Sequence, residues 1–255
     1  MTNRCLVKQG DCVNLIKDLS DSSVDLVVTS PPYDTLRKYQ GYSFDFKSLA
    51  KELYRVIKDG GVVVWIVSDK TINGSESLTS FKQAIYFNEI GFNVYDTMIW
   101  RKPNPSVPTE GRYYNAFEYM FVLSKGKPKS LNFICDKENK GYGKTYYSDT
   151  RMNPEERKKN TIKKTVGQYS RRHNVWDIAI GNNPTKHPAV FPLQLVKDHI
   201  VTWSEENDLV LDPFAGSGTT GIACIQTNRN FIGFEISEDY CLMANERIFT
   251  ELGNK

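Results

Sequence analysis

Residues 212–221 read Asp-Pro-Phe-Ala-Gly-Ser-Gly-Thr-Thr-Gly and follow an apolar run at residues 209–211. A short apolar run that leads through glycines into a helical pattern is typical of a buried strand turning directly into a helix. Glycine at such a turn lets the backbone approach a ligand closely. The next apolar run ends at Glu235, whose carboxylate can accept hydrogen bonds from ribose hydroxyls. We therefore expect a site for a nucleoside-type cofactor at this turn.

Two other interpretations of the glycine turn remain open at this point. The spacing of Gly216, Gly218 and Gly221 also fits the dinucleotide pattern G-x-G-x-x-G. Only 34 residues follow Gly221, which is short for the second half of a dinucleotide-binding fold. The turn could also be a plain connection between a strand and a helix. The position of Glu235 at the end of the following strand favours the nucleoside-type cofactor.

Outward from this turn, the chain alternates apolar runs with amphipathic stretches. We expect strands at residues 24–28, 62–67, 92–100, 117–123, 209–211 and 230–234. We expect helices at residues 45–58, 78–90, 192–203 and 237–251, with Gly60-Gly61 ending the first of them. Strands separated by helices predict an α/β fold with a mostly parallel sheet.

The charge of the chain is unevenly distributed. The 255 residues include 33 Lys+Arg and 30 Asp+Glu, for a net charge of +3. Residues 125–174 hold fourteen Lys/Arg and five Asp/Glu, a local charge of +9, which leaves −6 for the rest. Such a segment indicates an anionic partner, although a solvated basic loop is the simpler alternative. We predict a basic insertion at 125–172 within a main domain formed by 1–124 and 173–255.

Several classes of protein are excluded or disfavoured by composition. The five cysteines and three histidines show no zinc-ligand spacing, so we expect neither a metal site nor a disulfide framework. No apolar run approaches the roughly 18 residues that a membrane-spanning helix needs. The N-terminal residues do not resemble a signal peptide, and we expect a cytoplasmic protein.

A second motif, Ser30-Pro31-Pro32-Tyr33, follows the apolar run at 24–28. Ligands of open α/β sheets bind at the carboxyl ends of strands, where this motif falls. The prolines fix the chain direction, and a serine hydroxyl with a proline carbonyl could accept both protons of an exocyclic amine. Tyr33 could stack on a flat base. Taken alone, the motif is more often a rigid turn with a core tyrosine.

Together the two motifs resemble those of the amino-methylating DNA methyltransferases that use S-adenosyl-L-methionine. Their order here, with residues 30–33 before residues 212–220, is the permuted order of the beta group of that family. Further stretches match in the family's order: Gly10-Asp11-Cys12, Trp100-Arg-Lys102-Pro-Asn104-Pro105, Asn174-Val175-Trp176, and Lys186-His187-Pro188-Ala189 with Phe191-Pro192. The resemblance covers nearly the whole chain apart from the basic insertion, and it implies a Rossmann-like methyltransferase fold.

The resemblance also implies roles for individual residues. The motif Ser30, Pro31, Pro32 and Tyr33 would hold a flipped-out base. Residues expected at the cofactor are Asp11, Asp212, Pro213, Phe214, Gly216, Ser217, Gly218, Thr219, Glu235, His187, Pro188 and Ala189. His187 could instead be a structural histidine before the helix at 192–203. No metal is implied, and no cysteine follows a proline, so no nucleophile for attack at a pyrimidine carbon is evident.

The expected activity is methyl transfer to the exocyclic N4 amine of cytosine in double-stranded DNA. Ser30 in the first motif position is similar to the N4-cytosine branch of the family. The alternatives are an adenine-N6 methyltransferase, an RNA methyltransferase and a non-catalytic DNA-binding module. Candidate DNA contacts are Lys102, Asn104, Arg112, Lys144, Arg151, Lys158, Lys159, Lys163, Lys164, Arg171 and Arg172. A cognate restriction endonuclease and a second copy of the chain are candidate partners.

Overall fold

The computed structural model describes residues 5–32, 44–105, 111–148, 162–180 and 192–254. It divides into two compact units. The larger unit comprises Met1–Asn132 with Asn174–Lys255, and the smaller comprises Phe133–His173. Each is described separately below.

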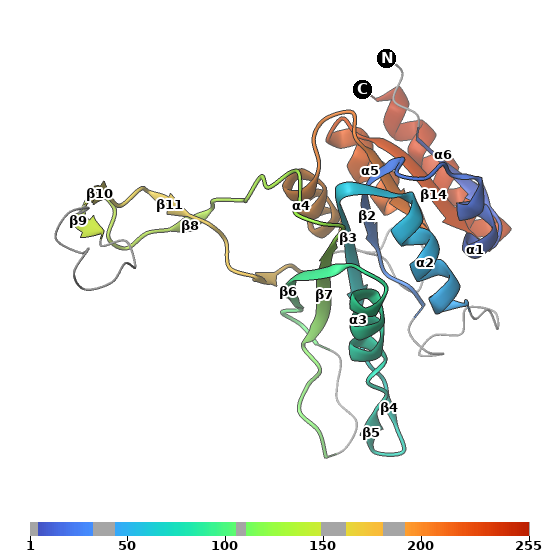
Figure 1. Cartoon of the computed structure of the whole chain (residues 1–255), viewed down its shortest axis with the longest axis horizontal. Helices are drawn as coiled ribbons and strands as arrows, with labels where there is room; N and C mark the ends of the chain where they lie inside the picture. The colour runs from blue at the N-terminus through green and yellow to red at the C-terminus, as the bar shows by residue number, and fades with distance from the viewer. Residues whose placement is uncertain (1–4, 33–43, 106–110, 149–161, 181–191, 255) are drawn as a thin grey trace. The chain divides into compact units, whose positions relative to one another are not determined.

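The larger unit is organised around a sheet that has eight strands in the described residues, in the order β1-β14-β13-β2-β3-β7-β6-β12 (Figure 1). Five of its seven strand pairings are parallel, and β7 runs antiparallel to both β3 and β6. The prediction of a mostly parallel sheet is confirmed. The strands are β1 (Cys5–Gln9), β2 (Val24–Thr29), β3 (Ile57–Val67), β6 (Asn93–Arg101), β7 (Phe117–Ser124), β12 (Val175–Asp177), β13 (Leu209–Asp212) and β14 (Asn230–Glu235).

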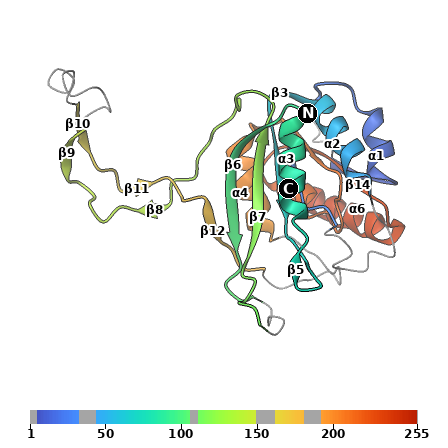
Figure 2. The ribbon, with the colours of Figure 1, turned by 60° about the horizontal axis from the view of Figure 1, so that its bottom comes forward.

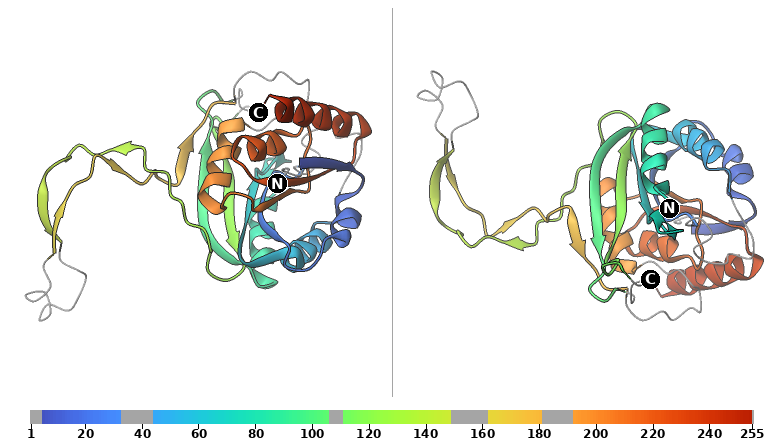
Figure 3. Two further views of the ribbon diagram at one scale, coloured as in Figure 1. Left: turned by 90° about the horizontal axis from the view of Figure 1, so that it is seen from above. Right: turned by 90° about the horizontal axis from the view of Figure 1, so that it is seen from below.

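Helices cover both faces of this sheet (Figures 2 and 3). One layer contains α1 (Cys12–Leu15), η1 (Ile16–Asp18), α2 (Phe46–Val56) and α3 (Thr79–Glu89), and the other contains α4 (Leu193–Trp203), α5 (Thr219–Gln226) and α6 (Glu238–Gly253). Side chains alternate across β2, so Leu26 and Val28 pack in the core beneath α4, α5 and α6. Val27 packs in the core beneath α2 and α3. Burial on both faces explains why Leu26, Val27 and Val28 are consecutive apolar residues in β2.

The predicted helix at 45–58 ends two residues too late, because the chain leaves the helical conformation at Ile57. That residue is extended, with φ −70° and ψ 135°, and pairs with Val24 as the first residue of β3. Gly60 and Gly61 therefore lie inside a strand and do not end the helix. A Cβ on Gly61 would come within 2.9 Å of the Asp25 carbonyl oxygen, so the close pairing of β2 with β3 requires glycine there.

The smaller unit is a two-stranded antiparallel ribbon, although the sequence showed no regular pattern there (Figure 1). Strand β8 (Lys137–Glu138) pairs with β11 (Tyr169–Ser170), and β9 (Thr145–Ser148) pairs with β10 (Ile162–Thr165). A further hairpin, β4 (Thr71–Ile72) with β5 (Ser75–Glu76), belongs to the larger unit. Among the described residues, no helix is long and apolar enough to cross a membrane.

Candidate active site

The carboxyl ends of three adjacent parallel strands bring the two sequence motifs together. Strand β13 pairs with β2 through Leu211 and Val27, and with β14 through Asp212 and Gly233. Thr29, at the end of β2, thereby lies beside the turn that follows Asp212. Glu235 ends the strand on the other side of that turn. The edge formed by these three ends is where open α/β sheets bind their ligands.

The glycine turn between β13 and α5 is held by the backbone. The Ala215 amide donates to the carbonyl of Phe234 at 2.8 Å, and the Gly218 amide donates to the carbonyl of Ala215 at the same distance. Gly218 has φ +81°, and a Cβ there would lie 3.0 Å from the Cβ of Ala244. Both the conformation and the space require glycine. Gly218 therefore lets the turn pack closely against Ala244 of α6, and ligand binding at this turn stays a prediction.

Glu235 is half-buried beside this turn. Its Oε2 accepts from the Gly216 amide and its Oε1 accepts from the Ser237 amide, each at 2.9 Å. Burial raises the pKa of this carboxyl group. A carboxylate has about four acceptor sites, so these amide contacts leave acceptor capacity for a hydroxyl donor. The residues present at this position therefore fit the ribose of a nucleoside-type cofactor.

Asp212 is buried, with 2% of its surface exposed. Its Oδ1 accepts from the Thr29 hydroxyl at 2.6 Å and from the Phe214 amide at 3.0 Å. Its Oδ2 accepts from the Thr220 hydroxyl at 2.6 Å. Burial raises the pKa of Asp212 to about 6. The contacts of this carboxyl group all hold the turn in place, and sequence reasoning missed Thr29 and Thr220 as its partners.

The Ser30-Pro31-Pro32 turn continues from β2 at the same edge. Ser30 and Pro32 are half-buried and Pro31 is buried. Ser30 follows Thr29 directly, so its position is fixed by the central strand of the sheet. Tyr33, the fourth residue of the predicted motif, lies outside the described residues.

Of the remaining predicted cofactor residues, those that the structure describes lie in the glycine turn and at the start of α5 or, for Asp11, just after β1. Phe214 is half-buried, and its ring meets that of Phe44 edge-on at 4.8 Å. Asp11 caps α1 by accepting from the Asn14 amide, and the neighbouring Gly10 amide donates to the Glu235 carbonyl. Pro213, Ser217 and Thr219 are buried within the turn and the first turn of α5. His187, Pro188 and Ala189 lie outside the described residues.

Three cysteines are buried in the larger unit, and burial favours their neutral thiol form. Burial, with the charges of Asp11 and Glu235, raises the pKa of Cys12 to about 12. Burial also raises the pKa of Cys224 and of Cys241. A thiol is a much weaker nucleophile than a thiolate, so these three side chains are unsuited to covalent attack on a base. No group of three His, Cys, Asp or Glu in the described residues could hold a metal ion.

Three of the candidate DNA-binding residues lie in the larger unit beyond the end of β6 and before β7. Lys102 pairs with Glu118 and lies 4.9 Å from the centre of the Trp100 ring. Arg112 donates to the Gly74 carbonyl at 2.5 Å, and Asn104 is exposed. The side chains of Lys102 and Arg112 thus already have partners within the protein.

The other candidates belong to the smaller unit. Lys144 and Lys164 are exposed on the β9–β10 ribbon. Arg171 stacks over Phe133 at 4.4 Å, and Arg172 donates to Asp136 with Nε at 2.8 Å. Arg151, Lys158 and Lys159 fall outside the described residues, as does the side chain of Lys163.

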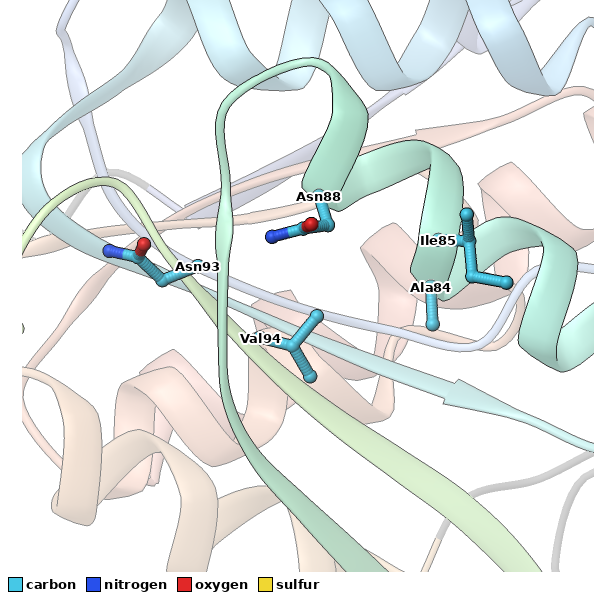
Figure 4. A pocket seen from close by; sticks show the side chains of 5 residues that line it. All are labelled: Ala84, Ile85, Asn88, Asn93 and Val94. Atoms are coloured by element: carbon cyan, nitrogen blue, oxygen red, sulfur yellow. The ribbon is translucent and has the colours of Figure 1, made fainter.

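A shallow hollow elsewhere on the larger unit is lined by apolar and amide side chains only. It lies between α3 and β6 and is lined by Ala84, Ile85, Asn88, Asn93 and Val94 (Figure 4). None of these side chains titrates. Asn93 begins β6, which runs parallel to β3 through the antiparallel β7, so the hollow lies at the amino edge of the sheet. The chemistry described above is at the opposite edge.

Known proteins with the same features identify the family. Residues 24–246 match the model of the N6/N4 methyltransferase family, described as DNA methylase. The chain is 49% identical over 245 residues to the orphan methyltransferase M.BamHII of Bacillus amyloliquefaciens, with 91% of each chain covered. TTHA0409 of Thermus thermophilus, a putative DNA modification methylase solved with S-adenosyl-L-methionine, is 26% identical with a TM-score of 0.66. That match covers 100% of this chain and 96% of the other.

A third comparison concerns the fold alone. The PvuII DNA methyltransferase, described as cytosine-N4-specific, has a TM-score of 0.68 and 20% identity over 99% of this chain and 95% of its own. The Rossmann-like methyltransferase fold expected from the sequence is thus confirmed, and the expected methyl donor agrees with the ligand of TTHA0409. With the glycine turn, Glu235 and the Ser30-Pro31-Pro32 turn at one edge of such a sheet, the chain belongs to the N6/N4 DNA methylase family and is an S-adenosylmethionine-dependent DNA methyltransferase.

Proposed function

We propose that the protein methylates the exocyclic N4 amine of a flipped-out cytosine in double-stranded DNA. The observation that carries this proposal is Ser30 at the carboxyl end of β2, one residue from the contact between Thr29 and Asp212. Serine at the first position of this motif is similar to the N4-cytosine branch of the family, whereas aspartate is more usual in the N6-adenine branch. Adenine N6 is the second candidate, because that amine also presents two protons and one delocalised nitrogen.

The reaction forms a bond between the amine nitrogen and the methyl carbon and breaks the bond between that carbon and the sulfonium. The sulfonium, when bound, supplies a methyl group that is electrophilic without a metal. The electron pair of the broken bond stays on the sulfur, which becomes a neutral thioether, and the methylated amine releases one proton to solvent. Before attack, the lone pair of the amine is delocalised into the ring. Acceptance of the amine protons by the Ser30 hydroxyl and the Pro31 carbonyl would orient the lone pair for attack. Stacking on Tyr33 would offset part of the few kcal/mol that base flipping costs.

The basic ribbon supplies the second part of the proposal, DNA recognition. Residues 133–173 contain eleven Lys/Arg and five Asp/Glu. Lys144 and Lys164 are exposed there and suited to phosphate contacts, whereas Arg172 is paired with Asp136 and Arg171 packs on Phe133. We assign phosphate binding to the two lysines, and the arginines to the structure of the ribbon. A cognate endonuclease and a homodimer remain predictions.

The test of the target base is mass spectrometry of nucleosides. Unmethylated DNA is incubated with the protein and S-adenosylmethionine and digested to nucleosides. The expected product is N4-methylcytosine, and N6-methyladenine without methylcytosine would contradict the proposed base.

Pro31→Ala tests the assignment of the motif. We expect turnover to fall by about 100-fold or more because the amine acceptor is displaced, with the dissociation constant for S-adenosylmethionine within about threefold of wild type. Titration calorimetry and radiolabelled methyl transfer give the two numbers. Unchanged turnover in this variant would remove the assignment.

A further inference from the structure

One buried carboxylate links the two halves of the active site. Thr29 is the last residue of β2 and precedes Ser30, while Thr220 lies in the first turn of α5, just after the glycine turn. Both hydroxyls donate to Asp212 at 2.6 Å, one to each carboxylate oxygen. Asp212 is therefore a bridge between the strand that carries the base-binding motif and the helix that follows the glycine turn.

The burial of these groups makes the bridge stiff. Thr29 is 0% exposed, Thr220 is 1% exposed and Asp212 is 2% exposed. Hydrogen bonds to a charged group are strong in such buried surroundings. If the carboxylate lost one of these donors, no water molecule would be at hand to replace it. The backbone pairing recorded between β2 and β13 ends at Val27 and Leu211. The hydrogen bond between Thr29 and Asp212 joins the same two strands beyond this pairing, at the residues where both strands end.

We propose that Thr29 is a positioning residue for methyl transfer: through Asp212, it fixes the Ser30-Pro31 turn relative to the glycine turn. The inference rests on the proposed role of Ser30 and Pro31 in holding the amine, and it applies equally to cytosine and adenine. Direct transfer requires the nitrogen to lie roughly 3 Å from the methyl carbon, and a displacement of about 1 Å can cost about 100-fold in rate. A side chain that fixes this separation acts on the rate without touching either reactant.

The inference predicts a separation of binding from rate. When the Thr29 hydroxyl is removed, Asp212 still accepts from the Phe214 amide and the Thr220 hydroxyl. These two hydrogen bonds hold the glycine turn that is proposed to bind the methyl donor. Loss of this hydroxyl should therefore slow the transfer while leaving S-adenosylmethionine bound almost as before.

The experiment compares Thr29→Val, which removes the hydroxyl, with Thr29→Ser, which keeps it. Thr202→Val is the matched control, because Thr202 is also a buried threonine and its hydroxyl donates to the Asp198 carbonyl at 2.7 Å in α4. For each protein, S-adenosylmethionine affinity is measured without DNA. The single-turnover rate of labelled methyl transfer is measured at saturating cofactor and unmethylated duplex DNA.

We expect Thr29→Val to slow single-turnover transfer by about 10- to 100-fold, with the cofactor dissociation constant within about threefold of wild type. Thr29→Ser should restore the rate to within about threefold of wild type, and Thr202→Val should match wild type in both measurements. The proposal is overturned if Thr29→Val reacts at the wild-type rate, or if Thr29→Ser is as slow as Thr29→Val. Should Thr29→Val fail to fold, Thr29→Ala takes its place in the same comparison.

The identity of the methylated base is determined separately, on DNA treated with the wild-type protein. A methyladenine product would contradict the proposed cytosine specificity while leaving the Thr29 comparison valid.

Discussion

Asp212 carries a carboxyl group whose protonation is coupled to folding. Burial raises its pKa from 3.8 to about 6, so the folded protein binds the proton more tightly than the unfolded chain does. The stability gained from this proton is present below pH 4 and is lost as the pH rises through 6. Asp212→Asn removes this titration. We expect the free energy of unfolding of wild type, relative to Asp212→Asn, to fall by roughly 1–3 kcal/mol between pH 4.5 and 7.

Urea denaturation of both proteins at several pH values measures this difference. Parallel stability curves across that range would contradict the assignment of the raised pKa to Asp212.

Glu235 offers a test of the cofactor site at a single residue. Glu235→Ala removes both carboxylate oxygens beside the glycine turn. Hydrogen bonds to a charged acceptor contribute about 1.5–3 kcal/mol, so we expect the dissociation constant for S-adenosylmethionine to rise by about 10- to 100-fold. Glu246→Ala, at an exposed position of α6, is the control and should bind like wild type. Equal affinity of the two variants by calorimetry would exclude the assigned role of Glu235.

At the scale of single elements, helix α5 depends on its close approach to the sheet. A Cβ on Gly221 would lie 2.6 Å from Cδ1 of Ile248 and 2.9 Å from the ring of Phe231. Gly221→Ala should therefore destabilise the protein by about 1–3 kcal/mol through overpacking. Gly253→Ala is the matched control, because a Cβ at that position of α6 meets nothing within 4 Å, and it should be neutral or slightly stabilising. Chemical denaturation of both variants measures the difference.

The strands and helices differ in how well the sequence predicts them. The strands buried on both faces, such as β2 and β3, were predicted because their apolar runs leave no other interpretation. β1 was missed because only Val7 of its five residues is buried, which leaves no apolar run. The end of α2 was misplaced because Ile57 and Val56 are both apolar, and only the pairing of Ile57 with Val24 converts the chain to a strand there.

For the whole molecule, the unequal distribution of charge predicts how DNA binding responds to salt. Each phosphate contact contributes about 0.9 to the slope of log Kd against log salt concentration. Lys144→Ala with Lys164→Ala should weaken DNA binding and reduce the slope by up to about 2. The control replaces Lys17 and Lys51 with alanine. Lys17 lies in η1 and Lys51 lies on α2, so both belong to the larger unit and neither is a candidate DNA contact. Equal slopes for the two double variants would contradict the role of the ribbon.

The site could be predicted from the sequence only as separate motifs. Position at a strand end identified Glu235 and Ser30 because parallel strands end at a common edge. The contact between Thr29 and Asp212 joins residues 183 positions apart, and no local pattern reports it. Thr29 reads as an ordinary β-branched strand residue, and its role depends on β2 lying next to β13 in the sheet order.

The same strand order has a consequence for synthesis of the protein on the ribosome. β2 lies between β3 and β13, and β1 pairs with β14. During synthesis, β1 and β2 therefore remain without these pairing partners until the last part of the chain is made. At about 5–20 residues per second, the interval lasts on the order of 10–40 seconds. During it, the unpaired edge of β2 is open to wrong pairing. The nascent chain can complete the sheet, and with it the site at its carboxyl edge, only after β13 and β14 have emerged.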